Sequence, residues 1–370
     1  VVGNPIPNTL FSRQSYNFGN GTVNTRPPLF DDPKPETTTS FETGLDVWLF
    51  DNKFNFDITY YNSTLRNQFL YVSTANGESK PVNTGKIRNY GLEFSAGYRW
   101  NINHDWRWQT GFNFAWNDNR ILETYKTESG VPYIVEMGTN AFKIKYIEGG
   151  RYGDIYVNSF ARDENGHIKI NGAGDYENAV PVMESGKYET YVGNTTSPVT
   201  LGWNNTFSWK NFNLYFLIDG RIGGKVMSLT EPDLDLFGLS ERSAHDRLKG
   251  ERVTQNGKEY VLKELPDGSG NKVPVENYYT TIGAYPMEDH VYNATNLRMR
   301  DISLSYNFSN LLGKNTGLTA QFSIKNAFFI YKDSPIDPDI SVSAANGYSG
   351  IDCYSLPTTR SYALTLKFNF

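Results

Sequence analysis

The sequence predicts an all-β protein in which about nine antiparallel strands form part of a transmembrane β-barrel with long extracellular loops. Nine stretches alternate apolar and polar residues, which is the pattern of a strand with one apolar face. The connectors between them are short and long in turn, as in outer-membrane barrels, whose tight turns and long loops lie at opposite ends. Aromatic residues mark strand ends: Trp100, Trp106 and Trp108 flank one short connector, and Trp116 lies at the far end of its strand.

Composition narrows the function classes. The 370 residues carry a net charge of -5, which argues against a nucleic-acid partner because such proteins present a basic face. The mean hydropathy of -0.52 is compatible with a barrel, since half of each strand faces water. The sequence contains no run of 18 apolar residues and therefore predicts no membrane-spanning helix. The residues from Val1 onward do not show the basic start and apolar stretch of a signal peptide, so we expect a mature chain or a fragment.

The expected strands follow one another as hairpins. They lie at about residues 37–50, 54–62, 86–100, 106–117, 199–209, 211–222, 296–308, 317–331 and 358–370. Short connectors follow the first, third, fifth and seventh strands, and the long ones span 63–85, 118–198, 223–295 and 332–357. We expect residues 1–36 to be an extracellular loop segment and residues 37–370 to be the C-terminal barrel part. An odd number of strands that begins at the outer surface places the C-terminus in the periplasm.

The first four strands show the clearest alternation. Phe54-Asn-Phe-Asp-Ile-Thr-Tyr60 is typical of them, and the short connector Asp51-Asn-Lys53 joins this strand to the one before. The fourth strand carries one uninterrupted apolar row, made of Trp106, Trp108, Thr110, Phe112, Phe114 and Trp116. Ten steps of about 3.3 Å, at a tilt near 40°, span roughly 25 Å, which is the height of the apolar band of such barrels.

The remaining strands follow the same rule, with one exception. The sixth strand carries Phe212, Leu214, Phe216 and Ile218 on one face, and the last strand runs from Tyr362 to Phe370. The seventh changes parity near Arg300-Asp301. Either a β-bulge reconciles its two halves, or the strand begins later and residues 296–300 stand above the membrane.

Charges separate by face in a way that favours a membrane barrel. The polar parity carries Asp46, Asp57, Glu93, Arg99, Arg107, Asp219, Asp301, Lys325 and Lys367. At the apolar parity, Lys86, Arg88 and Arg360 lie near the outer ends, where long basic side chains can reach the head groups. An Arg or Lys at mid-bilayer costs about 2–4 kcal/mol, which explains the sorting. A soluble β-sandwich also alternates, but its strands average about 5–6 residues, shorter than these.

Nine strands do not complete a single-chain barrel, because bacterial barrels have an even strand count and an open edge in lipid leaves costly unpaired backbone groups. We therefore expect the rest of the barrel on another polypeptide, cleaved off, or absent from this sequence. About thirteen more strands would make the 22-stranded, plugged transporter barrel.

A series of short motifs runs along residues 35–370. They are Glu42-Thr-Gly-Leu-Asp46, Thr59-Tyr-Tyr61, Asn89-Tyr-Gly-Leu-Glu93, Gly149-Gly-Arg-Tyr-Gly-Asp-Ile-Tyr156, Val192-Gly-Asn194, Trp209-Lys-Asn-Phe-Asn-Leu214, Leu297-Arg-Met-Arg-Asp-Ile-Ser-Leu-Ser-Tyr306, Lys325-Asn-Ala-Phe328, Asp337-Pro-Asp339 and Pro357-Thr-Thr-Arg-Ser-Tyr362. Together they resemble the motifs of SusC/RagA-type TonB-dependent transporters. Each motif is short, but all occur in the family's order; Arg151-Tyr152 departs from its pattern. We expect the TonB box, the plug domain and the first strands of the family to lie outside this sequence.

The resemblance implies TonB-dependent import of oligosaccharides or peptides across the bacterial outer membrane, as the barrel part of a SusCD-like complex. The implied partners are the remaining N-terminal barrel and plug polypeptide, a SusD-like surface lipoprotein, TonB through the plug, membrane lipid and the glycan or peptide substrate. It also implies that Phe370 is part of the barrel-assembly signal. A passive porin or structural barrel without energy coupling is the alternative.

Candidate substrate contacts come from the long connectors and the inner strand faces. Tyr152, Tyr156, Tyr278 and Tyr279 are candidates for stacking on sugar rings or peptide groups, although loop packing explains most loop tyrosines. Four charged residues have two possible roles: Asp219, Arg221, Arg298 and Arg300. They line the substrate path or they pair with the plug, and we favour pairing with the plug. We expect no enzyme activity, cofactor or metal: the histidines lack ligand spacing, and Asp163-Glu-Asn-Gly166 is better explained as a turn than as a calcium loop.

Overall fold

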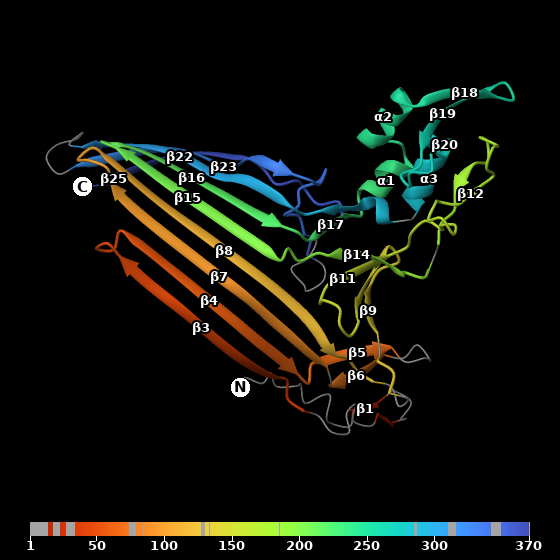
Figure 1. Cartoon of the computed structure of the whole chain (residues 1–370), viewed down its shortest axis with the longest axis horizontal. Coiled ribbons are helices and arrows are strands. Elements are labelled where there is room, and N and C mark those ends of the chain that lie inside the picture. Colours follow the sequence, from red (N-terminus) through yellow and green to blue (C-terminus); the bar gives the residue numbers. More distant parts are fainter. Residues whose placement is uncertain are drawn as a thin grey trace.

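The computed structural model describes residues 14–17, 23–26, 34–73, 79–83, 85–126, 130–132, 134–184, 186–284, 287–309, 316–341 and 349–369; Phe370 lies outside them. A single large antiparallel sheet dominates these residues (Figure 1). Its strands are β3 (Thr37–Leu49), β4 (Phe54–Arg66), β7 (Lys86–Asn101), β8 (Trp106–Glu123), β15 (Val199–Trp209), β16 (Phe212–Ile222), β22 (Asn296–Ser309), β23 (Gly317–Lys332) and β25 (Ser361–Asn369). The expectation of nine antiparallel barrel strands is confirmed.

The sheet is an open meander. Each strand pairs with its sequence neighbours in the order β25-β23-β22-β16-β15-β8-β7-β4-β3. Among the described residues, β3 and β25 each have a partner on one side only, and most of their residues are exposed. The two edges therefore carry unpaired backbone groups, and the sheet does not close on itself.

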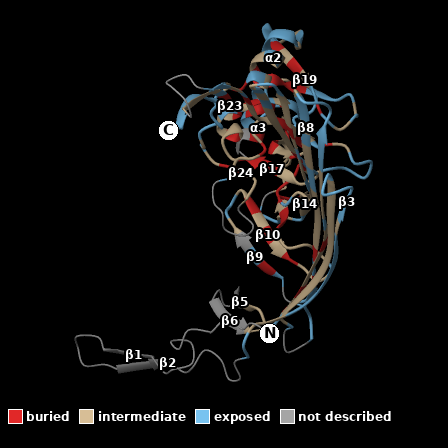
Figure 2. Cartoon of the chain, turned by 90° about the vertical axis from the view of Figure 1, so that its left-hand side faces the viewer, coloured by how far each residue is buried: buried red, intermediate tan, exposed pale blue. Residues whose placement is uncertain are grey.

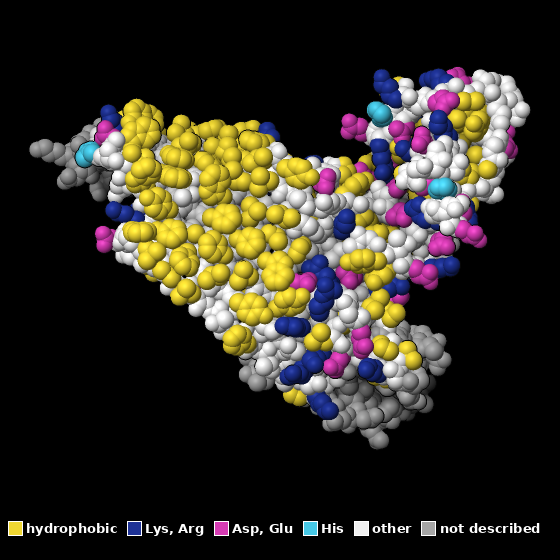
Figure 3. Space-filling view, viewed as in Figure 1, with side chains coloured by type: hydrophobic (Ala, Val, Ile, Leu, Met, Phe, Trp, Pro, Cys, Tyr) yellow, Lys and Arg dark blue, Asp and Glu magenta, His cyan; other side chains and the backbone are white. Residues whose placement is uncertain are grey.

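Apolar side chains cover one face of this sheet and remain exposed (Figure 3). One row crosses seven strands in register through Tyr98, Thr110, Asn205, Phe216, Ile302, Ile324 and Tyr362, and parallel rows beside it carry Trp203, Phe322 and Leu364. Asn205, a polar member of this row, is buried and accepts a hydrogen bond from Trp108 Nε1. Leu364 is 71% exposed and Phe322 is 48% exposed. Figure 2 shows the buried residues gathered beside the sheet, in the connectors. The β-sandwich alternative is wrong, because no second sheet of the described residues covers this face.

The parity change in β22 is a β-bulge. Leu217 pairs with Asp301, whereas the next residue, Ile218, pairs with Met299, so Arg300 has no partner in the ladder. The extra residue keeps Met299 on the apolar face and turns Arg298 and Arg300 to the other face. The alternative that the strand begins after residue 300 is wrong, since β22 begins at Asn296.

Two strands run further than expected, because their backbone ladders continue after the apolar alternation ends. β4 reaches Arg66, which pairs with Lys86, and β8 reaches Glu123, which also pairs with Lys86. The last strand begins at Ser361, later than expected.

The long connectors are folded rather than irregular. The connector after β4 forms the hairpin of β5 (Phe69–Ser73) and β6 (Ser79–Asn83). The next forms a four-stranded sheet of β9 (Val135–Gly138), β10 (Phe142–Tyr146), β11 (Asp154–Val157) and β14 (Thr190–Asn194), with the small pair β12 (Ile170–Asn171) and β13 (Val180–Pro181). A further pair, β1 (Gln14–Asn17) and β2 (Val23–Arg26), precedes the large sheet.

The third long connector is the only part of the described chain with α-helices. Its elements are β17 (Lys225–Ser228), α1 (Glu231–Leu236), α2 (Glu241–Lys249), β18 (Glu251–Gln255), β19 (Lys258–Glu264), β20 (Lys272–Pro274), α3 (Val275–Ala284), the 3-10 helix η2 (Met287–His290) and β21 (Val291–Asn293). We call residues 229–293 the helical module. β24 (Ile351–Asp352), from the last connector, pairs in parallel with β17. Among the described residues, no helix has the length and apolar character that crossing a membrane requires.

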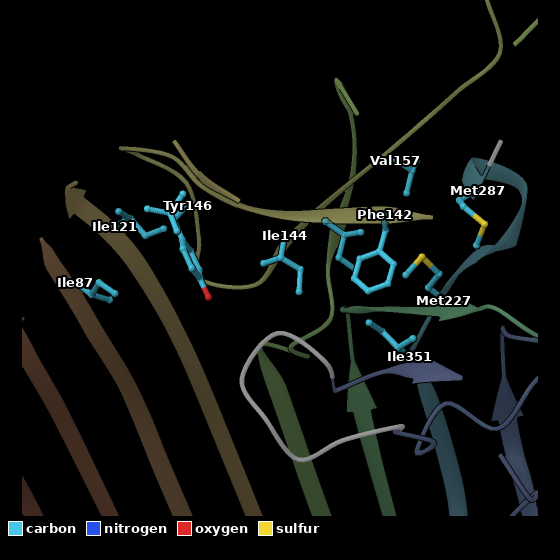
Figure 4. Packing of buried hydrophobic residues seen from close by; sticks show 11 residues of the cluster. Ile87, Ile121, Phe142, Ile144, Tyr146, Val157, Met227, Met287 and Ile351 are labelled. Carbon is cyan, nitrogen blue, oxygen red and sulfur yellow. The ribbon is translucent and has the colours of Figure 1, made fainter. Parts of the chain in front are cut away.

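The described residues of the connectors form two hydrophobic cores. The first joins the loop end of the sheet to the four-stranded sheet: Ile87 and Ile121 face Tyr146 and Ile144, and Phe142 continues the core toward Met227 (Figure 4). The second packs α3 against neighbouring strands through Phe160, Leu265, Val273 and Ile282. The first core therefore holds the four-stranded sheet to the inner side of the large sheet by ordinary apolar packing, whereas the second core lies within the connectors.

We expect Phe114→Lys to prevent assembly into a membrane, because Phe114 lies on the apolar face, between Phe94 and Leu201 on the adjacent strands. A lysine there costs about 2–4 kcal/mol at mid-bilayer. The matched control is Asn113→Lys, one residue away on the opposite face. The fraction of protein that shows heat-modifiable migration after membrane extraction measures assembly. Equal assembly of the two variants would show that Phe114 does not face lipid.

Candidate functional site

The bulge in β22 builds a cluster of charges on the inner face of the sheet, at its loop end. We define the charge cluster as Arg221, Arg298 and Arg300 together with Asp219, Asp337 and Asp339. Asp219 and Arg221 come from β16, and the two other arginines from β22. Asp337 and Asp339 belong to the segment 333–341, which leaves β23 and returns to the wall of the sheet.

Short ion pairs join the segment to the wall. Arg298 Nη2 lies 2.6 Å from Asp337 Oδ1, and Arg298 Nη1 lies 3.3 Å from Asp339 Oδ2. Arg300 binds Asp339 Oδ2 at 2.6 Å and Asp219 Oδ2 at 2.7 Å. Arg221 Nη1 is 3.5 Å from Asp339 Oδ1. Three guanidinium groups thus converge on Asp339.

Burial makes this cluster energetically sensitive. Arg298 is 2% exposed, and its guanidinium carbon lies 3.9 Å from the centre of the Phe329 ring. A buried cation is tolerated only when it is paired, and loss of its partner costs several kcal/mol. Burial alone raises the pKa of Asp339, but the hydrogen bond from Arg300 and the charges of Arg221, Arg300 and Arg298 outweigh it, so the pKa lies below its usual range. The carboxylate stays ionised at neutral pH.

A small cavity of about 200 Å³ adjoins the charge cluster. Asp219, Arg221, Arg300 and Asp339 line it, with Thr200 and Asn296 beside them. Arg221 is the most open of the cluster's arginines, with 47% of its side chain exposed. The cavity can therefore present a guanidinium and carboxylates to a polar ligand on the inner face.

A second polar site lies in the helical module and is organised by Asp235. This carboxylate is 1% exposed and accepts hydrogen bonds from Ser240 at 2.5 Å and from Arg242 Nε at 3.1 Å. His290 Nε2 lies 2.9 Å away. Ser240 also caps α2 by accepting the backbone N–H of Ser243. Burial raises the pKa of Asp235, but hydrogen bonds from His290, Arg242 and Ser240 outweigh it and lower the pKa.

A cavity of about 500 Å³ lies beside this network. Its walls are polar and carry both charges: Glu231, Glu241, Arg242, His245, Asp246, Lys263, Tyr278, Tyr279 and Tyr292. Pro335, from the segment that bears Asp337 and Asp339, also lines it. The segment 333–341 therefore lies between the helical module and the wall of the sheet.

The structure does not bring the four candidate tyrosines together. Tyr278 and Tyr279, on α3, are 2% and 3% exposed, and their hydroxyls donate to Asp289 and Asp246. Lys263 Nζ lies 4.9 Å and 5.5 Å from the two ring centres. Both residues still reach the wall of the larger cavity, so their contact with substrate stays a prediction.

Tyr152 and Tyr156 lie in the other connector core. Tyr152 stacks on Tyr146 with ring centres 4.7 Å apart. Tyr156, on β11, lies 5.4 Å from the Tyr191 ring and 5.3 Å from Lys145 Nζ. Burial, followed by the Asp154 charge, raises the pKa of Tyr156. Of the two, Tyr156 belongs to the more open aromatic pair, since Tyr191 is 52% exposed.

Sequence reasoning missed several residues of these sites. It singled out Arg298 and Arg300 without their partners Asp337 and Asp339, although Asp337-Pro-Asp339 was one of the motifs. Nothing in the spacing of Asp235, Arg242 and His290 indicated that they meet. Asp163 accepts the backbone N–H groups of Asn165 and His167, as a turn residue does. No group of three metal-ligating side chains lies within the described ranges.

Arg298→Gln is expected to release the segment 333–341, because it leaves Asp337 without its 2.6 Å partner. Breaking a buried pair costs about 3–5 kcal/mol, so amide hydrogen exchange at residues 336–340 should accelerate by about a hundredfold or more. Arg221→Gln is the matched control, with a small effect because its contact is longer and exposed. Equal exchange in both variants would contradict a holding role for Arg298.

The lowered pKa of Asp235 makes the helical module acid-sensitive. A carboxylate with a depressed folded-state pKa stabilises the fold above its unfolded pKa of about 3.9, and this contribution is lost as pH falls through the folded value. Near-UV circular dichroism melts at pH 7 and pH 3 should show the loss. Asp235→Asn should lower the melting temperature at pH 7 and reduce its dependence on pH; an unchanged pH dependence would exclude this group as the cause.

The chain matches a known protein family along more than half of its length. A family model described as "TonB dependent receptor-like, beta-barrel" matches residues 3–219, more than half of the chain. The chain is 25% identical over 373 residues to TonB-dependent receptor SusC of Bacteroides thetaiotaomicron, covering 96% of this chain and 34% of SusC. It is 24% identical to TonB-dependent receptor P3 of Formosa agariphila, covering 92% of this chain and 35% of that protein.

A solved structure shares the fold. The RagAB peptide importer in the "open-open" state aligns with a TM-score of 0.67 at 17% identity, covering 100% of this chain and 39% of that one. This chain therefore spans about a third of the length of the curated relatives it matches. The family match, the open amphipathic sheet and the folded connectors agree, and the chain belongs to the TonB-dependent receptor-like β-barrel family.

Proposed function

We propose that this chain is the barrel part of an importer that moves oligosaccharides or peptides across the bacterial outer membrane by TonB-dependent transport, in a SusCD-like complex. The observation that carries the proposal is the nine-stranded sheet with an exposed apolar face, in a chain that belongs to the TonB-dependent receptor family. The solved structure that shares the fold is named a peptide importer, which supports transport as the function.

The open edges support the need for further strands. β3 and β25 each lack a partner on one side among the described residues, and unpaired backbone in lipid costs several kcal/mol per group. We infer that an N-terminal barrel portion pairs with both edges and brings the plug through which TonB acts. About thirteen additional strands would complete a 22-stranded barrel.

Orientation follows from the connectors. We propose that the long connectors are extracellular and that the short turns and the C-terminus, with the assembly signal at Phe370, are periplasmic. Residues 1–36 would then lead into the barrel from an extracellular loop. The folded connectors, held to the sheet by their own apolar core, offer a rigid surface on which a SusD-like lipoprotein can sit.

Substrate contacts are proposed from two sites, the cavity on the inner face of the sheet and the cavity in the helical module. Arg221 and Asp219 line the smaller cavity, and Tyr278 and Tyr279 line the larger one. Tyr156 and Tyr152, from the same connector, would add aromatic side chains. A polar substrate that descends along the inner face would meet these groups in turn.

Uptake assays with the full-length protein test the proposal. Cells that express it should accumulate a labelled maltoheptaose or a labelled peptide digest, and a protonophore should abolish accumulation, because active import needs an energised inner membrane. Uptake that persists with the protonophore would favour the passive porin. The substrate that accumulates decides between glycan and peptide.

Arg221→Gln should lower the initial rate of that uptake by about tenfold, since a hydrogen bond to a charged group contributes roughly 1.5–3 kcal/mol. Lys210→Gln, at the short turn beyond β15, is the matched control and should leave uptake unchanged. Equal rates in both variants would remove Arg221 from the substrate path.

A further inference from the structure

The outward face of the sheet carries a group of basic side chains directly beyond its apolar field. Figure 3 shows Lys and Arg side chains gathered where the hydrophobic field ends beside the connectors. At this end β4, β7 and β8 extend past the last aromatic residues of the apolar face, Tyr90 and Trp116, whose rings meet edge to face at 5.7 Å. We define the basic band as Arg66, Lys86, Arg88, Arg120 and Arg151.

Like charges lie opposite one another in this band. Arg66 pairs in register with Lys86, and Arg88 pairs in register with Arg120. Side chains that are directly opposite on antiparallel strands lie about 5 Å apart at Cβ, and like charges there are destabilising. Two such pairs lie side by side on three strands, so a bound negative charge would stabilise them.

The carboxylates that contact the band neutralise only part of it. Glu123 lies 3.2 Å from Lys86, and Asp118 lies 2.6 Å from Arg151 and 3.7 Å from Arg120. Arg88 donates to the Asn62 amide oxygen at 3.0 Å and lies 5.0 Å from the Tyr90 ring, which are neutral partners. Within the described part of the chain, neither Arg66 nor Arg88 has a carboxylate at ion-pair distance. The Asp154 carboxylate also accepts the backbone N–H of Arg151 at 2.8 Å. Five basic side chains against three acidic ones leave an excess of two positive charges.

The height of the band matches the head groups of a membrane. Arg120 lies four residues beyond Trp116 on β8, which is about 13 Å along the strand and roughly 10 Å along the normal of a tilted barrel. Aromatic girdles lie at the interface, so the band lies at the level of lipid phosphates. Guanidinium groups bind phosphate oxygens through paired N–H donors, which makes arginine well suited to this ligand.

We propose that the basic band binds the phosphate groups of an anionic glycolipid in the membrane leaflet on the connector side, so that one lipid molecule bridges β4, β7 and β8. The acyl chains of that lipid would lie along the apolar rows below the band, which continue it without a break. The bound phosphates would offset the repulsion within the Arg66–Lys86 and Arg88–Arg120 pairs. The inference goes beyond import and rests only on the proposed direction of the sheet in the membrane.

Native mass spectrometry of the full-length protein in detergent, titrated with diphosphoryl lipid A, tests the proposal. The unaltered protein should bind one lipid molecule at a lower lipid concentration than any further lipid molecules. Arg66→Gln, Arg88→Gln and Arg120→Gln combined should weaken that binding by roughly a hundredfold, since each basic side chain near anionic lipid contributes about a factor of five. Dephosphorylated lipid A should bind the unaltered protein as weakly as lipid A binds this variant.

The matched control removes three charges from the opposite end of the same strands, by Lys53→Gln, Arg99→Gln and Arg107→Gln, and should keep full binding. An equal loss in both variants, or equal binding of dephosphorylated lipid A, would overturn the proposal. Displacement of the lipid by millimolar inorganic phosphate would also overturn it, because the site would then recognise free phosphate. Circular dichroism confirms that both variants fold, and the readout does not depend on transport, so a failed uptake assay leaves it intact.

Discussion

A single sheet whose two faces meet different solvents is the constraint on which the rest of the structure depends. Phe, Leu and Trp occupy one face and stay exposed, with Leu364 at 71% and Trp203 at 40%, while charged and polar side chains occupy the other. In water an exposed apolar face of this size would favour association with other molecules. In the hydrocarbon of a membrane the same face is stable. The backbone must then be paired throughout, which explains long strands, a continuous ladder and the need for further strands at β3 and β25.

The bulge in β22 reconciles that constraint with function. Without it, strict alternation would place either Arg298 and Arg300 or the row from Ile302 to Phe308 on the wrong face. One extra residue lets both halves obey the rule, and it turns two guanidinium groups inward together. Their pairing with Asp337 and Asp339 then brings a connector back against the wall, so the same local irregularity both protects the apolar face and shapes the inner surface.

The connectors carry the protein's conventional cores. Ile121 and Ile87 lie on the loop-end extensions of barrel strands, yet they are 2% and 8% exposed because the four-stranded sheet packs on them. Asp235 and Arg242 organise the helical module around buried charge, with Ser240 and His290 completing the hydrogen bonds. Rigid connectors of this kind can hold binding groups at fixed positions over a pore, which irregular loops of the same length would not do.

The sequence by itself determined the nine strands, their order and the face of most of their residues, because period-two alternation and connector length are local properties that a membrane enforces strongly. It left the parity of β22 near Arg300 open, and the structure resolved it as a bulge. It also singled out Asp219, Arg221, Arg298 and Arg300 as charges of a substrate path or of a plug contact. It did not determine that β4 and β8 extend to Arg66 and Glu123, since those extensions depend on a neighbouring strand and not on alternation. Only the tertiary structure decided which charges pair, that Tyr278 and Tyr279 are buried, and that Arg66 faces Lys86 while Arg88 faces Arg120. Such contacts join residues tens to hundreds of positions apart, and no local pattern records which side chain a distant segment will place opposite.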